Sequence, residues 1–158
     1  MKKMTTSKSG KDLIKAFEGL RLEAYLCPAG VPTIGWGHTR RVKMGQRITL
    51  QQAEDLLVED IAPCERILNA MGVNFRQEQF DALTSFIFNV GTGNFSASTL
   101  RKKILKDAPD EDIAMEFTKW IYSNKIALPG LIGRRVLEAN MFLGYEMYKV
   151  EKGKIVEV

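Results

Sequence analysis

The 158-residue sequence has few of the residue types that build metal centres and disulfide scaffolds. Its two cysteines, Cys27 and Cys64, are too few for a disulfide framework and do not form a Cys-x-x-Cys pair. A zinc site of histidine and cysteine ligands is not expected either, because the chain has only one histidine. We therefore predict free thiols in a reducing compartment and no metal centre.

Long apolar runs and low-complexity segments are also missing from the sequence. No stretch approaches the ~20 apolar residues that a membrane-spanning helix needs. The N-terminal segment MKKMTTSKSGKDLIKAF is basic and polar, and it has no apolar core of the kind found in secretory signals. We therefore expect a protein that has no membrane span and is made in the cytoplasm. If it acts elsewhere, another agent must move or release it.

The composition and the charge are those of a globular domain with a mildly basic surface. The chain is 45% hydrophobic and 27% charged, and its length suits one domain. A net charge of +4 favours encounter with anionic partners such as nucleic acid, membrane faces or the acidic polymers of a bacterial wall. The chain has no clustered Lys/Arg recognition helix and no RNA-binding aromatic motif, so we expect no nucleic-acid partner.

Hydrophobic spacing predicts a short first helix, then a small sheet, then a long helix. The first helix covers residues 9–18 and stops at Gly19. Residues 25–38 combine turn chemistry with β-branched and aromatic residues, which predicts a hairpin or a three-stranded sheet with residues 47–48 as a possible last strand. Thr49 and Gln52 fit a capping box that opens a helix to about residue 71, in which Pro63 predicts a kink or a break.

The second half of the sequence predicts further helices around one hydrophobic centre. The segment 77–90 is the most apolar and should be the central helix. Helices are also expected over 98–106, 110–120 and 131–148, with Pro109 and the Pro129-Gly130 pair as breaks. The tail over 149–158 either adds a short strand or is free. The predicted fold class is α+β, with a small N-terminal β-sheet lobe, a larger helical lobe and a cleft between them.

Glu18 is the carboxylate whose position suggests acid–base chemistry. The predicted first helix places it in the last turn, where the helix dipole disfavours an ionised carboxylate. Its apolar neighbours Phe17 and Leu20 add desolvation, which acts in the same direction. Both effects suit a general acid that holds its proton near neutral pH. The same position also suits an exposed glutamate at a helix end.

Three other residues are candidates for chemistry or for the core. Thr33 stands on the predicted sheet, where its hydroxyl can hold a water molecule or simply favour a strand. His38 can be an acid, a base or a ligand, although a single histidine at a strand end is often a hydrogen-bonded structural residue. Cys64 lies on the apolar face of a predicted helix and is expected in the core.

The stretch Phe17–Thr39 resembles the phage-type lysozymes, the muramidase endolysins of glycoside hydrolase family 24. The family signature has a glutamate in the context E-G-L-R-L-x-A-Y, then an aspartate nine positions after it, a threonine six further, and T-I-G-x-G-H. This sequence has EGLRLEAY over residues 18–25 and TIGWGH over residues 33–38.

The resemblance continues over most of the chain, strongest over residues 10–147. QFDALTSFIFNVG over 79–91 is similar to the central helix of the family, and FSASTL over 95–100 follows it. PGLIGRRVLE over 129–138 is similar to the closing helix, which carries two arginines. The resemblance implies that residues 1–158 form a single lysozyme-like muramidase domain with a C-terminal tail over 149–158.

The resemblance also implies an activity and a set of site residues. The family cleaves the β-1,4 bond between N-acetylmuramic acid and N-acetylglucosamine in peptidoglycan, without a metal or an organic cofactor. By position, Glu18 is implied to be the acid and Thr33 a hydroxyl partner. His38 is implied to lie beside the site, and Phe95 and Ser98 to line the cleft.

The closing helix is expected to complete this site. One of Arg134 and Arg135 is implied to reach the carboxylate of Glu18, without the sequence saying which. We include Arg135 in the substrate-binding set.

The second catalytic position of the family departs from its pattern. Nine residues after Glu18 the sequence has Cys27 where the family has aspartate. Three outcomes are open. The Cys27 thiolate can act as a nucleophile or a base; Cys27 and Thr33 can merely hold water while Glu18 works alone; or the domain can be a catalytically impaired pseudo-lysozyme that still binds peptidoglycan.

The resemblance further implies where the protein works. It is expected to be a monomer that is made in the host cytoplasm and acts on peptidoglycan in the periplasm or cell wall after release. A phage endolysin fits this expectation, and so does an injected antibacterial effector.

Overall fold

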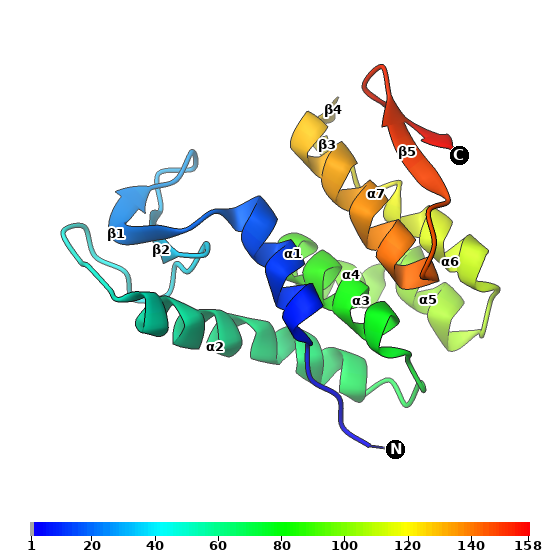
Figure 1. Cartoon of the computed structure of the whole chain (residues 1–158), viewed down its shortest axis with the longest axis horizontal. Helices are drawn as coiled ribbons and strands as arrows, with labels where there is room; N and C mark the ends of the chain where they lie inside the picture. The colour runs from blue at the N-terminus through cyan, green and yellow to red at the C-terminus, as the bar shows by residue number, and fades with distance from the viewer. Residues whose placement is uncertain (1) are drawn as a thin grey trace.

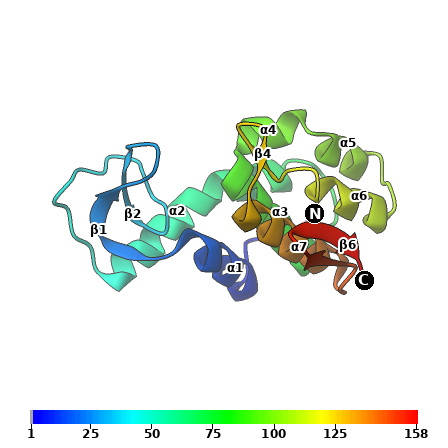
Figure 2. The same cartoon turned by 90° about the horizontal axis from the view of Figure 1, so that it is seen from above.

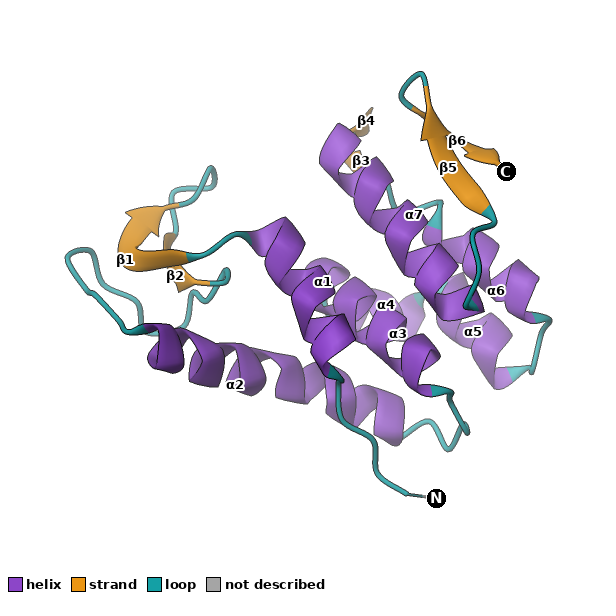
Figure 3. Cartoon of the chain, in the orientation of Figure 1, coloured by secondary structure: helices purple, strands orange, loops and turns teal. Residues whose placement is uncertain are grey.

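The computed structural model describes residues 2–158, which form a small hairpin lobe and a larger helical lobe (Figure 1; Figure 3). This arrangement confirms the predicted α+β class. The helices are α1 (Lys8–Glu18), α2 (Leu50–Asn69), α3 (Gln77–Val90), α4 (Thr92–Ala97), α5 (Thr99–Leu105), α6 (Asp110–Phe117) and α7 (Pro129–Leu143). The strands are β1 (Arg21–Leu26), β2 (Pro32–Gly35), β3 (Tyr122–Ser123), β4 (Ile126–Ala127), β5 (Tyr148–Glu151) and β6 (Lys154–Glu157).

The small lobe is built on the antiparallel pair β1 and β2. Tyr25 pairs with Thr33 and Leu26 with Pro32 across the turn between the strands. The first strand begins at Arg21, earlier than predicted. The sequence did not indicate this start, because the residues before Tyr25 are mostly exposed and lack the alternation that marks a half-buried strand. The possible third strand is reduced to one bridge between Glu23 and Arg47.

The long helix α2 joins the two lobes, as Figure 2 shows. Its first half packs Ala53, Leu57 and Ile61 against the small-lobe cluster, and its second half packs Cys64 and Leu68 into the large core. The predicted capping box of Thr49 and Gln52 is present at its start. Of the two outcomes predicted at Pro63, a kink or a break, the break is wrong, because the helix continues through the proline. Apolar packing on both sides of the proline offsets the lost backbone hydrogen bond.

The helix α3 is the centre of the large lobe, as its sequence predicts. It packs against α7, α1 and α2, and residues 79–87 are all buried. The Phe86 ring meets Phe117 and Trp120 edge-on, with ring centroids 5.2 and 5.6 Å apart. This packing fixes the end of α3, which is where the helix reaches the cleft.

The last long helix differs from the prediction at both ends. It begins at Pro129 rather than at residue 131, since a fixed φ and a missing N–H cost nothing at the first helical position. The helix ends at Leu143 rather than near Tyr148, because Gly144 adopts a left-handed cap with φ of +83°. The tail over 149–158 is not free, since most of it forms the β5–β6 hairpin. The helix α4 and the β3–β4 hairpin were not predicted, because both are very short.

Within residues 2–158, no helix has the length and apolarity to cross a membrane.

Candidate active site

Glu18 ends α1 and places its carboxylate between the two lobes. Gly19 closes the helix with φ of +68° and donates its N–H to the Lys15 carbonyl at 3.0 Å. On the small-lobe side the carboxylate lies against Gly37, where a Cβ would come within 2.6 Å of Glu18 Oε1. Gly37 also has φ of +76°, so both its conformation and its contact require glycine.

On the large-lobe side, a buried arginine holds the other carboxylate oxygen. Arg134 Nη1 donates to Glu18 Oε2 at 2.9 Å, and the two side chains are 3% and 23% exposed. The closing helix therefore presents Arg134, not Arg135, to Glu18. This ion pair links the end of α1 to α7.

The same arginine belongs to a buried charge network on α7 and α3. Arg134 Nε donates to Glu138 Oε2 at 3.2 Å, and Ser85 Oγ donates to the same oxygen at 2.6 Å. Arg135 donates to Glu138 Oε1, to the Trp120 carbonyl at 2.9 Å and to Asn89 Oδ1. Every nitrogen of Arg135 thus has an acceptor within the protein.

Burial lowers the pKa of the Arg135 guanidinium, and the neighbouring Glu138 carboxylate opposes this effect. Since the ordinary pKa of arginine lies far above neutral pH, Arg135 keeps its charge. It acts as a buried cation that faces Glu138 and the side chain of Asn89.

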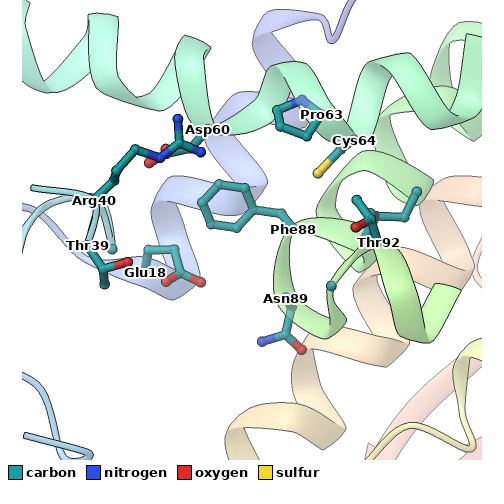
Figure 4. A pocket seen from close by; sticks show the side chains of 12 residues that line it. Glu18, Thr39, Arg40, Asp60, Pro63, Cys64, Phe88, Asn89 and Thr92 are labelled. Carbon is teal, nitrogen blue, oxygen red and sulfur yellow. The ribbon is translucent and has the colours of Figure 1, made fainter. Parts of the chain in front are cut away.

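A cavity of about 360 Å³ opens beside Glu18 between the two lobes. Figure 4 shows the Phe88 ring between Glu18 and Cys64, with Asn89 on the wall formed by α3. The small lobe contributes Gly37, Thr39 and Arg40, and α2 contributes Asp60, Pro63 and Cys64. An apolar ring among amides, hydroxyls and charges matches the composition of small-molecule sites.

The cavity wall includes residues that the sequence did not single out, chiefly Phe88 and Asn89. Both lie in the last turn of α3, just before the Gly91 cap. The sequence signal that could have identified them is their position just before Gly91, in the segment 79–91 that is similar to the central helix of the family. Helical periodicity alone assigns them to the core helix and does not show that they face a cleft.

Cys27 and Thr33 lie together at the β1–β2 turn. Cys27 N donates to the Val31 carbonyl at 3.0 Å, and Thr33 Oγ1 donates to the same carbonyl at 2.9 Å. Hydrogen bonding from the Val31 backbone lowers the pKa of the Cys27 thiol, with smaller contributions from Ala29, Thr33 and Gly30; burial acts in the opposite direction. The turn therefore favours a negatively charged side chain at position 27.

Cys64 has the opposite environment. It is 4% exposed, within the apolar packing of α2, and burial raises the pKa of its thiol to about 12. The prediction that Cys64 belongs to the core is confirmed. Neither cysteine is in a disulfide.

His38 is 5% exposed and bonded through both ring nitrogens. Nδ1 lies 2.8 Å from Asp60 Oδ2, and Nε2 lies 2.9 Å from the Arg40 carbonyl. Asp60 and Arg40 both line the cavity, so His38 connects two residues of the cavity wall without lining the cavity itself.

The remaining predicted site residues lie inside the large lobe. Phe95 is fully enclosed in its core. Ser98 caps α5 by accepting from Arg101 N at 3.1 Å, and it donates to the Phe95 carbonyl at 2.6 Å. Arg135 is fully buried as well. None of these three side chains is among those that line the cavity beside Glu18, and neither are those of Cys27, Thr33 and His38.

Comparison with known proteins agrees with this geometry. The sequence model of the family described as Phage lysozyme matches residues 15–138. The chain is 44% identical over 144 residues to the endolysin of Acyrthosiphon pisum secondary endosymbiont phage 1, covering 88% of this chain and 98% of that protein. It is 40% identical over 157 residues to the endolysin of Bacillus phage PZA, covering 95% of this chain but 59% of that protein.

A solved structure agrees equally well. The endolysin from Escherichia coli O157:H7 phage FAHEc1 superposes with a TM-score of 0.82 at 37% identity, covering 89% of this chain and 94% of that one. The fold and the cleft carboxylate thus define a lysozyme-like glycoside hydrolase. The chain belongs to the phage lysozyme family, and it is an enzyme that hydrolyses the peptidoglycan of the bacterial cell wall.

Proposed function

We propose that this enzyme cleaves the β-1,4 bond between N-acetylmuramic acid and N-acetylglucosamine, with Glu18 as the general acid. The observation that supports this role is the position of Glu18, whose carboxylate reaches the inter-lobe cavity between Gly37 and Arg134. The protonated carboxyl group gives its proton to the glycosidic oxygen as the bond to the anomeric carbon breaks.

Cys27 and Thr33 supply the second group on the hairpin side. In one form of the mechanism they hold the water that attacks the anomeric carbon, and the product is inverted. In the other form the Cys27 thiolate attacks, a glycosyl–sulfur bond forms, and water then hydrolyses it with retention. The lowered pKa of the Cys27 thiol supports an anionic sulfur in either form.

The buried members of the predicted site act through their neighbours. His38 orders Asp60 and Arg40 on the cavity wall. Ser98 and Phe95 stabilise the start of α5 and the core beneath the cleft. Arg135 fixes the Asn89 side chain through its amide oxygen, which leaves the amide NH₂ for a hydrogen-bond acceptor of the glycan.

The same proposal covers the domain organisation, the oligomeric state and the location of the protein. Residues 1–158 act as a single muramidase domain and as a monomer. The protein gathers in the cytoplasm where it is made and reaches the wall only after release.

Analysis of the products tests the bond, the acid and the outcome together. Purified peptidoglycan is digested, and the new reducing ends are identified and their anomeric configuration is assigned before mutarotation. Muramic acid at the reducing end supports the proposed bond, and glucosamine there contradicts it. The α anomer indicates attack by water, and the β anomer indicates a Cys27 intermediate.

The same digest separates the enzyme from a binding protein. Cys27 in place of the family aspartate is the observation that favours a catalytically impaired peptidoglycan binder. Retention on sedimented cell walls without any new reducing end would support that alternative and contradict the proposed cleavage.

A further inference from the structure

We propose that Glu138, a buried residue outside the cavity, is a positioning residue that keeps Glu18 able to hold its proton by sharing Arg134 with it. This inference rests on the proposed role of Glu18 as the acid. It answers a conflict at the site, because an arginine 2.9 Å from a carboxylate favours the ionised form, whereas a general acid must be protonated.

The geometry makes Arg134 a shared cation. One end of its guanidinium, Nη1, meets Glu18 Oε2 at 2.9 Å, and Nε meets Glu138 Oε2 at 3.2 Å. Arg134 Nη2 donates to the Ser85 carbonyl at 3.0 Å. Because each nitrogen has an acceptor, the guanidinium cannot turn fully toward Glu18 without giving up a buried contact.

Burial gives Glu138 its influence. The Glu138 side chain is fully enclosed and that of Arg134 is 3% exposed, so solvent screens their interaction far less than it would at the surface. A carboxylate that is fixed and ionised here repels a second negative charge on the other side of the same guanidinium. Glu138 therefore opposes the ionisation of Glu18.

The other charged groups complete this balance. Arg135, which follows Arg134 on α7 and lies three residues before Glu138, neutralises part of the Glu138 charge. From α3, Ser85 contributes its hydroxyl and its backbone carbonyl, neither of which is charged. Across the cavity, Arg40 and Asp60 are of opposite sign and line the same wall. Lys15 on α1 is paired with Glu54 at 2.6 Å.

Two substitutions should move the ionisation of Glu18 in opposite directions. In Glu138→Gln the shared arginine pairs with Glu18 alone, so Glu18 loses its proton at lower pH. In Arg135→Gln the Glu138 charge is less neutralised and draws Arg134 more strongly, so Glu18 keeps its proton to higher pH. The control is Ser85→Ala, which removes the hydrogen bonds of the hydroxyl to Glu138 and Arg134 and leaves every charge in place.

The measurement is the pH dependence of peptidoglycan hydrolysis together with carbon-13 NMR of the Glu18 carboxyl group. We expect the alkaline limb of the activity profile to move down by about one pH unit in Glu138→Gln and up in Arg135→Gln. In Ser85→Ala it should stay close to that of the parent. The NMR titration should follow the same order, and it reports the ionisation of Glu18 whether or not Glu18 is the acid.

The outcomes separate this inference from the proposed function. Opposite shifts support charge sharing, and one folded variant with its expected shift is sufficient if the other does not fold. A lower melting temperature without any shift, shifts of the same sign, or failure of both variants to fold would overturn the inference and leave Glu138 a residue of the fold. An NMR shift that the activity profile does not follow would support charge sharing and contradict Glu18 as the acid.

Discussion

Glu18, the proposed acid, and Cys27, in the hairpin turn, are held in different ways. On the helical side, buried charged partners on α7 fix Glu18. On the hairpin side, backbone groups of one short turn surround Cys27. A buried charge network requires particular side chains at several positions. A turn that offers N–H groups can hold either a thiol or a carboxylate, as the proposed exchange of aspartate for Cys27 requires.

The largest effect on the hairpin side is expected from Cys27→Ala. It removes the thiol but not the turn, and loss of a general base or nucleophile commonly costs about 10²–10⁴-fold in rate. Cys27→Asp should keep the activity or raise it, because the same N–H groups can bind a carboxylate. The rate of peptidoglycan clearing checks both variants. An alanine variant as active as the parent would make Cys27 a spectator.

Gly37→Ala tests how closely the small lobe approaches Glu18. The added Cβ would lie 2.6 Å from Glu18 Oε1, so the carboxylate must move. A misplacement of about 1 Å can cost on the order of 10²-fold in rate. The positive φ should also lower the free energy of unfolding by about 1–3 kcal/mol.

The matched control for Gly37→Ala is Gly45→Ala. Gly45 also has a positive φ, of +92°, but no atom lies within 4 Å of an added Cβ. It should lose similar stability and keep more of the activity. Equal activity loss in the two variants would mean that backbone strain, rather than contact with Glu18, limits the rate.

The two thiols should differ in reactivity toward iodoacetamide. Because thiolate is the reacting form, Cys27, with its lowered pKa, should react with a pH midpoint below that of an ordinary thiol, about 8.5. Cys64, whose pKa is raised to about 12, should stay unmodified until the protein unfolds. Mass spectrometry of labelled peptides across pH measures both. Faster labelling of Cys64 than of Cys27 in the folded protein would contradict the two environments.

The smallest effect is expected from Ser98→Ala. Loss of the cap on α5 should lower the free energy of unfolding by about 1 kcal/mol. The KM for peptidoglycan should not change, because the Ser98 side chain does not line the cavity. A raised KM with unchanged stability would instead indicate that Ser98 contacts the glycan.

The sequence predicts the long elements well because their signals are local. The capping box joins Thr49 to Gln52, three residues on, and the apolar face of α3 repeats within single helical turns; both are present in the structure. Pro63 shows the limit of such rules, since tertiary packing maintains the helix through it. The short hairpin β3–β4 has too few residues to produce a pattern.

The site is predictable in its motif but not in its contacts. The position of Glu18 at a helix end, just before Gly19, identifies it as a candidate acid. The choice of Arg134 over Arg135 depends on the rotation of α7 about its axis, which is set by packing on α3 far away in sequence. For the same reason the sequence does not show that Asn89 faces the cavity while Phe95 faces the core.

The central claim is that Glu18 is the proton donor, and Glu18→Gln tests it most directly. The glutamine keeps the size of the side chain and can still accept a hydrogen bond from Arg134, but it has no acidic proton to give. We predict a variant that melts within a few degrees of the parent and clears cell walls at least about 10²-fold more slowly. A folded variant that clears cell walls as fast as the parent would contradict the account.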